Sequence, residues 1–203
     1  MSKLFIFVIV FLLVQTVLYL GVEIFEGEPH DVERAIDKRI PVVPAFTFIY
    51  VSWYLLIFIM PFLLYYADFG TFLIYMGAMT AIILISTIAY LVYPTSFKRP
   101  DSGSQKLKFL YFISYKQLNC APSMHCSMSF VAVVAACLCP GLSPVVRVLV
   151  IADGLMIPVS TLFTKQHVVI DVLTALPLAA AGWAAGWGLY VSGLAEKCLG
   201  FLR

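Results

Sequence analysis

The stretch VPAFTFIYVSWYLLIFIMPFLLYYADFGTFLIYMGAMTAIILISTIAYLVY (residues 43–93) carries a single charged residue, Asp68. Asp68 separates two apolar runs, residues 43–66 and 69–93, and each exceeds the roughly 20 residues that an α-helix needs to cross a bilayer. The runs are unbroken rather than alternating with a period of two, which favours helices over the strands of a membrane barrel. We therefore expect two membrane helices joined by a very short turn near Asp68.

Four further apolar stretches are long enough to cross a membrane as helices: residues 4–22, 124–139, 145–163 and 168–191. Hydrophobic residues make up 62% of the chain and charged residues 12%, whereas soluble domains have about half and a quarter. The sequence therefore predicts an all-α integral membrane protein. We expect one domain over residues 1–203, a six-transmembrane helix bundle with both termini on one side and an active site at one membrane face.

The first apolar stretch, residues 4–22, resembles the core of a signal peptide in composition. It exceeds the roughly 7–15 apolar residues of such a core, and no small-x-small cleavage site follows it. We therefore expect a retained first span.

The net charge and the spacing of the cysteines argue against two kinds of partner, nucleic acid and zinc. The formal net charge is only +2, which argues against nucleic acid, because that partner requires a basic surface. The five Cys residues form no CxxC pair and no Cys/His array with zinc spacing. We expect the lipid bilayer as the main partner, with no metal and no cofactor.

Three loops are expected at the membrane face opposite the termini: residues 23–41, 94–122 and 164–166. In the second loop, residues 107–118 interleave Lys with Phe, Tyr, Ile and Leu. This pattern is typical of an amphipathic helix that lies on the membrane surface.

Two histidines begin membrane helices at that same face. His125 opens the fourth span and His167 precedes the sixth, with Asp171 four residues later. Residues i and i+4 share a helix face, so the carboxylate can hold one imidazole nitrogen and leave the other nucleophilic. An unpaired carboxylate in an apolar helix would be costly, which makes His167 the expected partner of Asp171.

Fixed positive charges surround these histidines in the sequence. Arg99 follows Lys98 in the second loop, and Lys165 lies two residues before His167. The guanidinium fork of arginine matches phosphate oxygens. Ser123 lies near a helix N-terminus, where backbone N–H groups favour anions. The sequence therefore predicts a phosphate site at this face.

Three segments resemble the type 2 phosphatidic acid phosphatase superfamily, whose motifs read K-x6-R-P, P-S-G-H and S-R-x5-H-x3-D. They are Lys-Arg-Pro (98–100), Pro-Ser-Met-His (122–125) and Ser-Thr-Leu-Phe-Thr-Lys-Gln-His-Val-Val-Ile-Asp (160–171). The order of the motifs and their inner spacings agree.

The resemblance implies roles for individual residues. His167 is the implied nucleophile and forms a phosphohistidine, Asp171 orients it, and His125 protonates the leaving alcohol. The implied phosphate-binding group consists of Arg99, Lys98, Ser123, Lys165 and Ser160, together with backbone N–H groups. The superfamily requires no metal.

Three positions depart from these motifs. Val92 stands at the first motif's Lys, Met124 at the second motif's Gly and Thr161 at the third motif's Arg. We expect Lys98 and Lys165 to supply the missing charges. The Ser-Thr-x-aromatic pattern before the last motif is similar to fungal inositol phosphorylceramide synthases, which transfer the phospho-head group to a lipid alcohol.

Three functions follow, in order of preference. The first is a lipid phosphate phosphatase that acts through a phosphohistidine on a phospholipid or an isoprenoid phosphate. The second is a phosphotransferase that moves a head group to a lipid alcohol such as ceramide or diacylglycerol, as sphingomyelin and inositol phosphorylceramide synthases do. The third is a non-catalytic lipid-binding or transport protein, which would not need both histidines.

Two arguments disagree on which side of the membrane the face with the histidines lies. Most Lys and Arg residues lie on the face that bears the histidines, and the positive-inside rule would place that face in the cytoplasm. The superfamily resemblance implies an extracytoplasmic or lumenal site. Several of the basic residues are themselves expected site residues, so we follow the resemblance.

Overall fold

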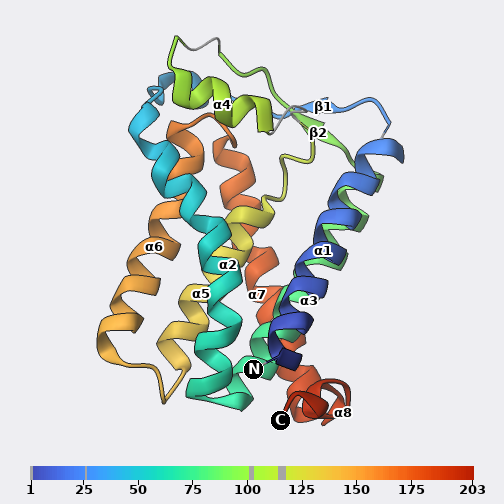
Figure 1. Ribbon diagram of the computed structural model, residues 1–203. Coiled ribbons are helices and arrows are strands. Elements are labelled where there is room, and N and C mark those ends of the chain that lie inside the picture. The colour runs from blue at the N-terminus through green and yellow to red at the C-terminus, as the bar shows by residue number, and fades with distance from the viewer. Residues whose placement is uncertain (1, 26, 101–102, 114–117) are drawn as a thin grey trace.

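The computed structural model describes residues 2–25, 27–100, 103–113 and 118–203 (Figure 1). Six helices run along the long axis of the bundle: α1 (Ser2–Phe25), α2 (Thr47–Ala67), α3 (Phe69–Val92), α5 (Met124–Leu138), α6 (Pro144–Phe163) and α7 (Val169–Val191). Across its ends lie α4 (Gln105–Ile113) and α8 (Leu194–Leu199). The remaining elements are short: β1 (His30–Asp31), β2 (Thr95–Ser96), and the 3-10 helices η1 (Asp37–Arg39), η2 (Pro44–Phe46) and η3 (Gly200–Leu202).

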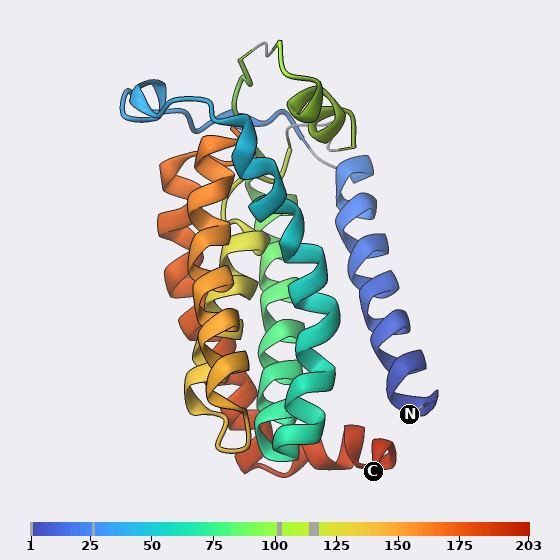
Figure 2. The same cartoon turned by 60° about the vertical axis from the view of Figure 1, so that its left-hand side comes forward.

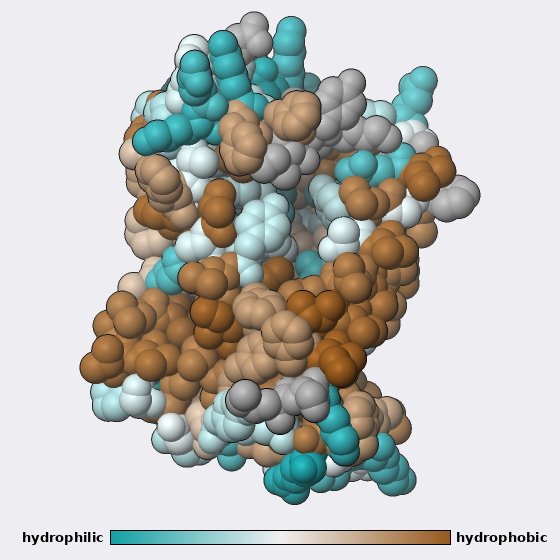
Figure 3. Space-filling model, viewed as in Figure 1, coloured by the Kyte–Doolittle hydropathy of each residue, from teal (hydrophilic) through white to brown (hydrophobic). Residues whose placement is uncertain are grey.

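Five of these helices are long and apolar enough to cross a membrane: α1, α2, α3, α6 and α7. They confirm the all-α class and fit a multi-pass membrane protein. Figure 3 shows the matching surface, a hydrophobic band between two hydrophilic ends. Both termini lie at one end of the bundle, and β1, β2 and α4 lie at the other (Figure 1).

The expected fourth span, α5, is shorter than the other long helices. It has 15 residues, which corresponds to about 22 Å, against a hydrocarbon core of about 30 Å. Its start is recessed because the preceding loop enters the bundle first: the Tyr90 hydroxyl, in the last turns of α3, donates a 2.7 Å hydrogen bond to the Pro122 carbonyl. The helix that carries His125 therefore begins inside the protein rather than at its surface.

The α2–α3 hairpin forms as its sequence predicts. Asp68 caps α3, and its Oδ2 accepts hydrogen bonds from the Thr71 amide at 2.7 Å and the Thr71 hydroxyl at 2.6 Å. The α5–α6 turn packs against the same hairpin, because a side chain at Gly141 would collide with the Ala67 carbonyl. These contacts fix the short turns at the end of the bundle that carries the termini.

Helices α3 and α7 pack together along much of their length. Glycines permit this approach, as small residues commonly do between membrane helices. A Cβ atom at Gly186 of α7 would meet the Ile74 carbonyl oxygen and would lie 2.7 Å from the Ala78 amide nitrogen on α3. Tyr90 of α3 is bonded to Pro122 in the second loop, and α7 carries Asp171. The α3–α7 contact therefore helps to hold this loop and Asp171 in place relative to each other.

The loops at the opposite end are held by two local contacts. Strand β1 pairs in parallel with β2, and the His30 ring stacks on Tyr93 at 4.2 Å between centroids. Helix α4 begins at Gln105, two residues before the predicted surface helix, and residues 114–117 of that prediction lie outside the described residues. Leu107 and Leu110 of α4 are buried against Tyr50.

The α3–α7 contact can be tested with two glycines of α7. Gly186→Ala should lower the thermal unfolding temperature in detergent, because overpacking a close contact costs about 1–3 kcal/mol. Gly188→Ala is the matched control, since a Cβ atom there meets nothing within 4 Å, and it should be neutral or stabilising by up to about 1 kcal/mol. Equal unfolding temperatures for the two variants would contradict this packing.

Candidate active site

His167 is held by the tight turn between α6 and α7. The Thr161 carbonyl accepts hydrogen bonds from the Gln166 amide at 2.9 Å and from the His167 amide at 3.2 Å. Lys165 makes this turn possible with a positive φ of 54°. The turn buries the His167 side chain and places it just before the first turn of α7.

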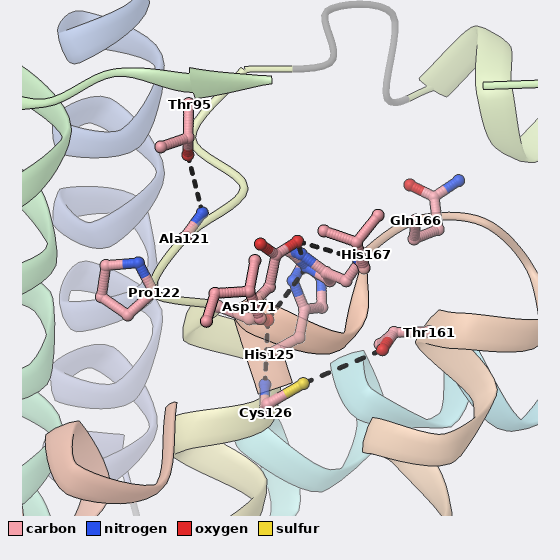
Figure 4. Close-up of polar contacts among 12 residues, drawn as sticks. Thr95, Ala121, Pro122, His125, Cys126, Thr161, Gln166, His167 and Asp171 are labelled. Atoms are coloured by element: carbon pink, nitrogen blue, oxygen red, sulfur yellow. Dashed lines mark hydrogen bonds and ion pairs between the residues drawn. The ribbon is translucent and has the colours of Figure 1, made fainter. Parts of the chain in front are cut away.

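Asp171 orients the His167 ring. Its Oδ2 lies 3.1 Å from His167 Nδ1, and the same oxygen accepts a 3.0 Å hydrogen bond from the Val168 amide (Figure 4). Asp171 is completely buried, so its carboxyl group requires hydrogen-bonding partners. In the tautomer that carries its proton on Nδ1, Nε2 is the basic nitrogen of His167.

Ser123 lies against that basic nitrogen. Its hydroxyl is 2.9 Å from His167 Nε2 and accepts a 3.3 Å hydrogen bond from the Cys126 amide as the N-cap of α5. With Nε2 unprotonated, the hydroxyl donates to it. The Ser123 amide also donates to the Asp171 carbonyl at 3.3 Å, which ties α5 and α7 together at the site.

His125 lies beside His167, with 5.6 Å between the ring centroids. Its ring is flanked by Trp53 at 4.1 Å and Tyr50 at 5.1 Å, and the Tyr50 hydroxyl is 3.0 Å from His125 Nε2. These contacts fix the second imidazole on the α2 side of the site. A group bound between the rings can be attacked by one and protonated by the other.

Arg99 brings a fixed positive charge to the turn that carries His167. Its Nη2 donates a 2.8 Å hydrogen bond to Gln166 Oε1, and its guanidinium lies 4.9 Å from the centre of the Tyr111 ring. Burial lowers the pKa of Arg99, but an arginine pKa begins above about 12, so the group stays charged. Tyr111 is anchored in turn by its 3.0 Å hydrogen bond to the Thr164 carbonyl.

A cavity of about 650 Å³ opens from these residues between α1 and the rest of the bundle. Figure 2 shows α1 standing apart from the other helices, and Figure 3 shows a hollow above the hydrophobic band. Arg99, His125 and His167 line a polar end of this cavity. Helices α1 and α2 contribute polar side chains, Gln15 and Glu23 among them, and the apolar side chains Leu12, Ile57 and Phe58 at the other end.

Four residues of the predicted phosphate-binding group do not line this cavity within the part of the chain that the structure describes: Lys98, Ser123, Ser160 and Lys165. Ser123 is completely buried beside His167. Lys98 is exposed, and the Ser160 hydroxyl is buried and donates to the Ile157 carbonyl at 2.6 Å. Lys165 Nζ donates to the Asp37 carbonyl at 2.7 Å, because its backbone conformation directs the side chain toward the first loop. Burial lowers the pKa of Lys165, and the nearby Asp37 partly opposes this effect.

The three departures from the sequence motifs differ in their surroundings. Val92 is exposed at the end of α3, and Met124 lines the cavity. Thr161 is buried, and its hydroxyl donates to the Pro158 carbonyl at 2.7 Å. None of the three brings a charge to the cavity, so Arg99 is the one Lys or Arg among the described residues that line it.

Asp37 is a site-positioning residue that the sequence did not reveal. Its carboxylate accepts hydrogen bonds from the Val169 amide at 2.8 Å and the Arg34 amide at 2.8 Å. Together with the Lys165 contact, these bonds hold the first loop on the turn that carries His167. Gln166, Tyr50 and Trp53 were also missed; only Gln166 had a signal, its place next to His167.

Searches of family models, curated proteins and solved structures found no match to this chain. Among the residues that the structure describes, no three His, Cys, Asp or Glu side chains form a group that could hold a metal ion. The function therefore has to be inferred from the geometry of the site.

The two cations at the turn should differ in phosphate binding. Arg99→Lys should weaken binding of orthovanadate by about tenfold or more, because it removes a charge-assisted donor pair that lysine cannot replace. Lys165→Met should change the vanadate Kd less than about threefold, as expected for a partly exposed cation bonded elsewhere. Isothermal titration of the detergent-solubilised protein measures both. A loss at Lys165 equal to that at Arg99 would return Lys165 to the phosphate site.

Proposed function

We propose that the protein is a membrane-embedded lipid phosphate phosphatase that works through a phosphohistidine at His167. One observation carries the proposal: a carboxylate-oriented His167 faces a second histidine at the polar end of a cavity whose other end is apolar. A phosphate ester on a hydrocarbon chain has the same division into a charged end and an apolar end.

The proposed reaction has two displacements. His167 Nε2 forms a bond to phosphorus, the ester P–O bond breaks, and the leaving lipid oxygen takes a proton from the His125 imidazolium. Water then attacks the phosphohistidine, His125 recovers its proton from that water, and inorganic phosphate leaves. General acid–base help of this kind contributes about 10²–10⁴-fold in rate.

Charge that develops on the phosphoryl oxygens needs fixed donors. Arg99 supplies a guanidinium, and the Ser123 hydroxyl can turn from His167 Nε2 to a phosphate oxygen. The first amides of α5 add the positive end of the helix dipole. These groups would act in a largely buried site, where electrostatic interactions are stronger than in water.

In the proposed topology six helices cross the bilayer: α1, α2, α3, α6, α7 and the shorter α5, which packs against α2, α3, α6 and α7. The site opens to the extracytoplasmic or lumenal side, and both termini lie on the opposite side. This orientation rests on the resemblance of the three motifs.

A phosphotransferase is the second candidate. The apolar end of the cavity gives a lipid alcohol access to the same phosphohistidine, where it could replace water as the acceptor. Release of inorganic phosphate from a phospholipid in detergent, with and without added ceramide or diacylglycerol, separates the two. A non-catalytic lipid-binding protein would show no turnover under either condition.

The nucleophile can be tested with the three histidines of the chain. His167→Ala should abolish phosphate release from phosphatidic acid while the protein remains folded, and Asp171→Asn should slow release by about 10²–10⁴-fold. His30→Ala is the matched control and should retain activity, since His30 stacks on Tyr93 outside the cavity. Activity in His167→Ala would rule out this mechanism.

The acid role of His125 predicts a dependence on the leaving group. His125→Ala should slow hydrolysis of phosphatidic acid far more than that of p-nitrophenyl phosphate, because only the basic alkoxide needs a proton as it leaves. The kcat/KM values of the two substrates provide the comparison. Equal losses on both would remove His125 from the acid role.

A further inference from the structure

Two carboxamide side chains line the cavity without the hydrogen bonds that buried amides normally make. Asn119 is 3% exposed and Gln15 is 7% exposed, and both belong to the cavity wall. Among the described residues, neither Asn119 Oδ1 nor Nδ2 has a partner, and Gln15 Oε1 has none. Gln15 Nε2 lies 3.8 Å from the Met128 sulfur, a weak acceptor.

Buried polar atoms are nearly always paired, and an unpaired one is unfavourable. A ligand in the cavity would supply the missing partners. For Asn119 this conclusion holds whichever way the amide is turned, because both of its polar atoms lack a partner.

The backbone conformation at position 119 explains why Asn is found there, but it does not explain why the side-chain amide is unpaired. Its φ of 61° lies in the left-handed region, which Asn adopts more readily than most residues and Gly more readily still. This explains the residue type but not why a buried amide lies unpaired against the cavity. Asn119→Gly therefore separates the two roles, because it keeps the backbone conformation and removes the amide.

Asn119 is held close to the reacting groups. It lies on the loop that leads to Ser123, and the next two residues are fixed to β2: the Cys120 amide donates to the Thr95 carbonyl at 3.4 Å and the Ala121 amide to the Thr95 hydroxyl at 2.8 Å. Gln15 reaches the cavity from α1, beside Met128 of α5. Both amide side chains therefore belong to the wall that Arg99 and the two histidines also line.

We propose that Asn119, assisted by Gln15, selects lipid phosphates that carry a hydrogen-bond donor next to the phosphate. Asn119 Oδ1 and Gln15 Oε1 are acceptors, and a hydroxyl or an amide N–H of the lipid would donate to them. A diacylglycerol phosphate offers ester acceptors alone, and an isoprenoid phosphate offers neither donors nor acceptors beyond its phosphate. This substrate preference rests on the proposed phosphatase function and narrows it.

Two matched substrate pairs test the proposal. The first is 1-oleoylglycerol 3-phosphate and its 2-O-methyl ether, which differ only in a free hydroxyl. The second is N-oleoylethanolamine phosphate and its N-methyl amide, which differ only in the amide N–H. The wild-type enzyme should favour at least one donor-bearing member by about tenfold in kcat/KM, the scale of one satisfied buried hydrogen bond.

The variants assign that preference to the two amides. Asn119→Gly should bring the ratio close to one, and Gln15→Leu, which keeps the size of the side chain, should lower it severalfold. Thr80→Val is the control, since Thr80 is an exposed residue of α3 whose hydroxyl donates to the Met76 carbonyl, and it should keep the wild-type ratio. A wild-type ratio of one on both pairs, or an unchanged ratio in both variants, would overturn the proposal.

A binding measurement tests the selection of lipids independently of the proposed catalytic step. Native mass spectrometry of His167→Ala with the same lipid pairs should show the same preference for donors, and Asn119→Gly in that background should remove it. Preference in binding without wild-type turnover would refute the phosphatase and leave the selection intact. Turnover without preference would refute the selection alone.

Discussion

The hydrogen bond between Asp171 and His167 is the interaction on which the rest of the site depends. A carboxylate that is completely buried in an apolar helix needs partners, and it finds them in the His167 ring and the Val168 amide. The same turn is held from two sides, by the Ser123 amide on the Asp171 carbonyl and by Asp37 on the Val169 amide. The contacts that orient the His167 ring therefore also fix its position in the site.

The second constraint is the depth in the bundle at which α5 begins. Helix α5 begins inside the bundle, so His125 and Ser123 lie below the loops rather than on them. Helix α1 contacts α2 and α3 through Phe5 and Phe7 near its N-terminal end, while its other half lines the cavity. In the proposed function this arrangement lets a lipid keep its chain in an apolar environment while its phosphate reaches Arg99 and the histidines.

Local patterns were predictable from the sequence, and tertiary contacts were not. The run at residues 69–93 forms α3 (Phe69–Val92), and the i,i+4 spacing of His167 and Asp171 gives the contact expected of it. Lys165 bonds to Asp37 because of the turn's positive φ and a loop more than a hundred residues away, neither of which local spacing reveals. Tyr50 and Trp53 were indistinguishable from packing aromatics until the fold brought them to His125.

The most direct test of the central claim is to trap the phosphoenzyme. Purified protein is mixed with a ³²P-labelled lipid phosphate and quenched within milliseconds in alkali, in which phosphohistidine is stable and acyl phosphates are not. Peptide mass spectrometry then locates the label. A phosphohistidine mechanism predicts phosphate on His167 and none in the His167→Ala protein. Turnover of the lipid without labelled His167, or a label on another side chain, would contradict it.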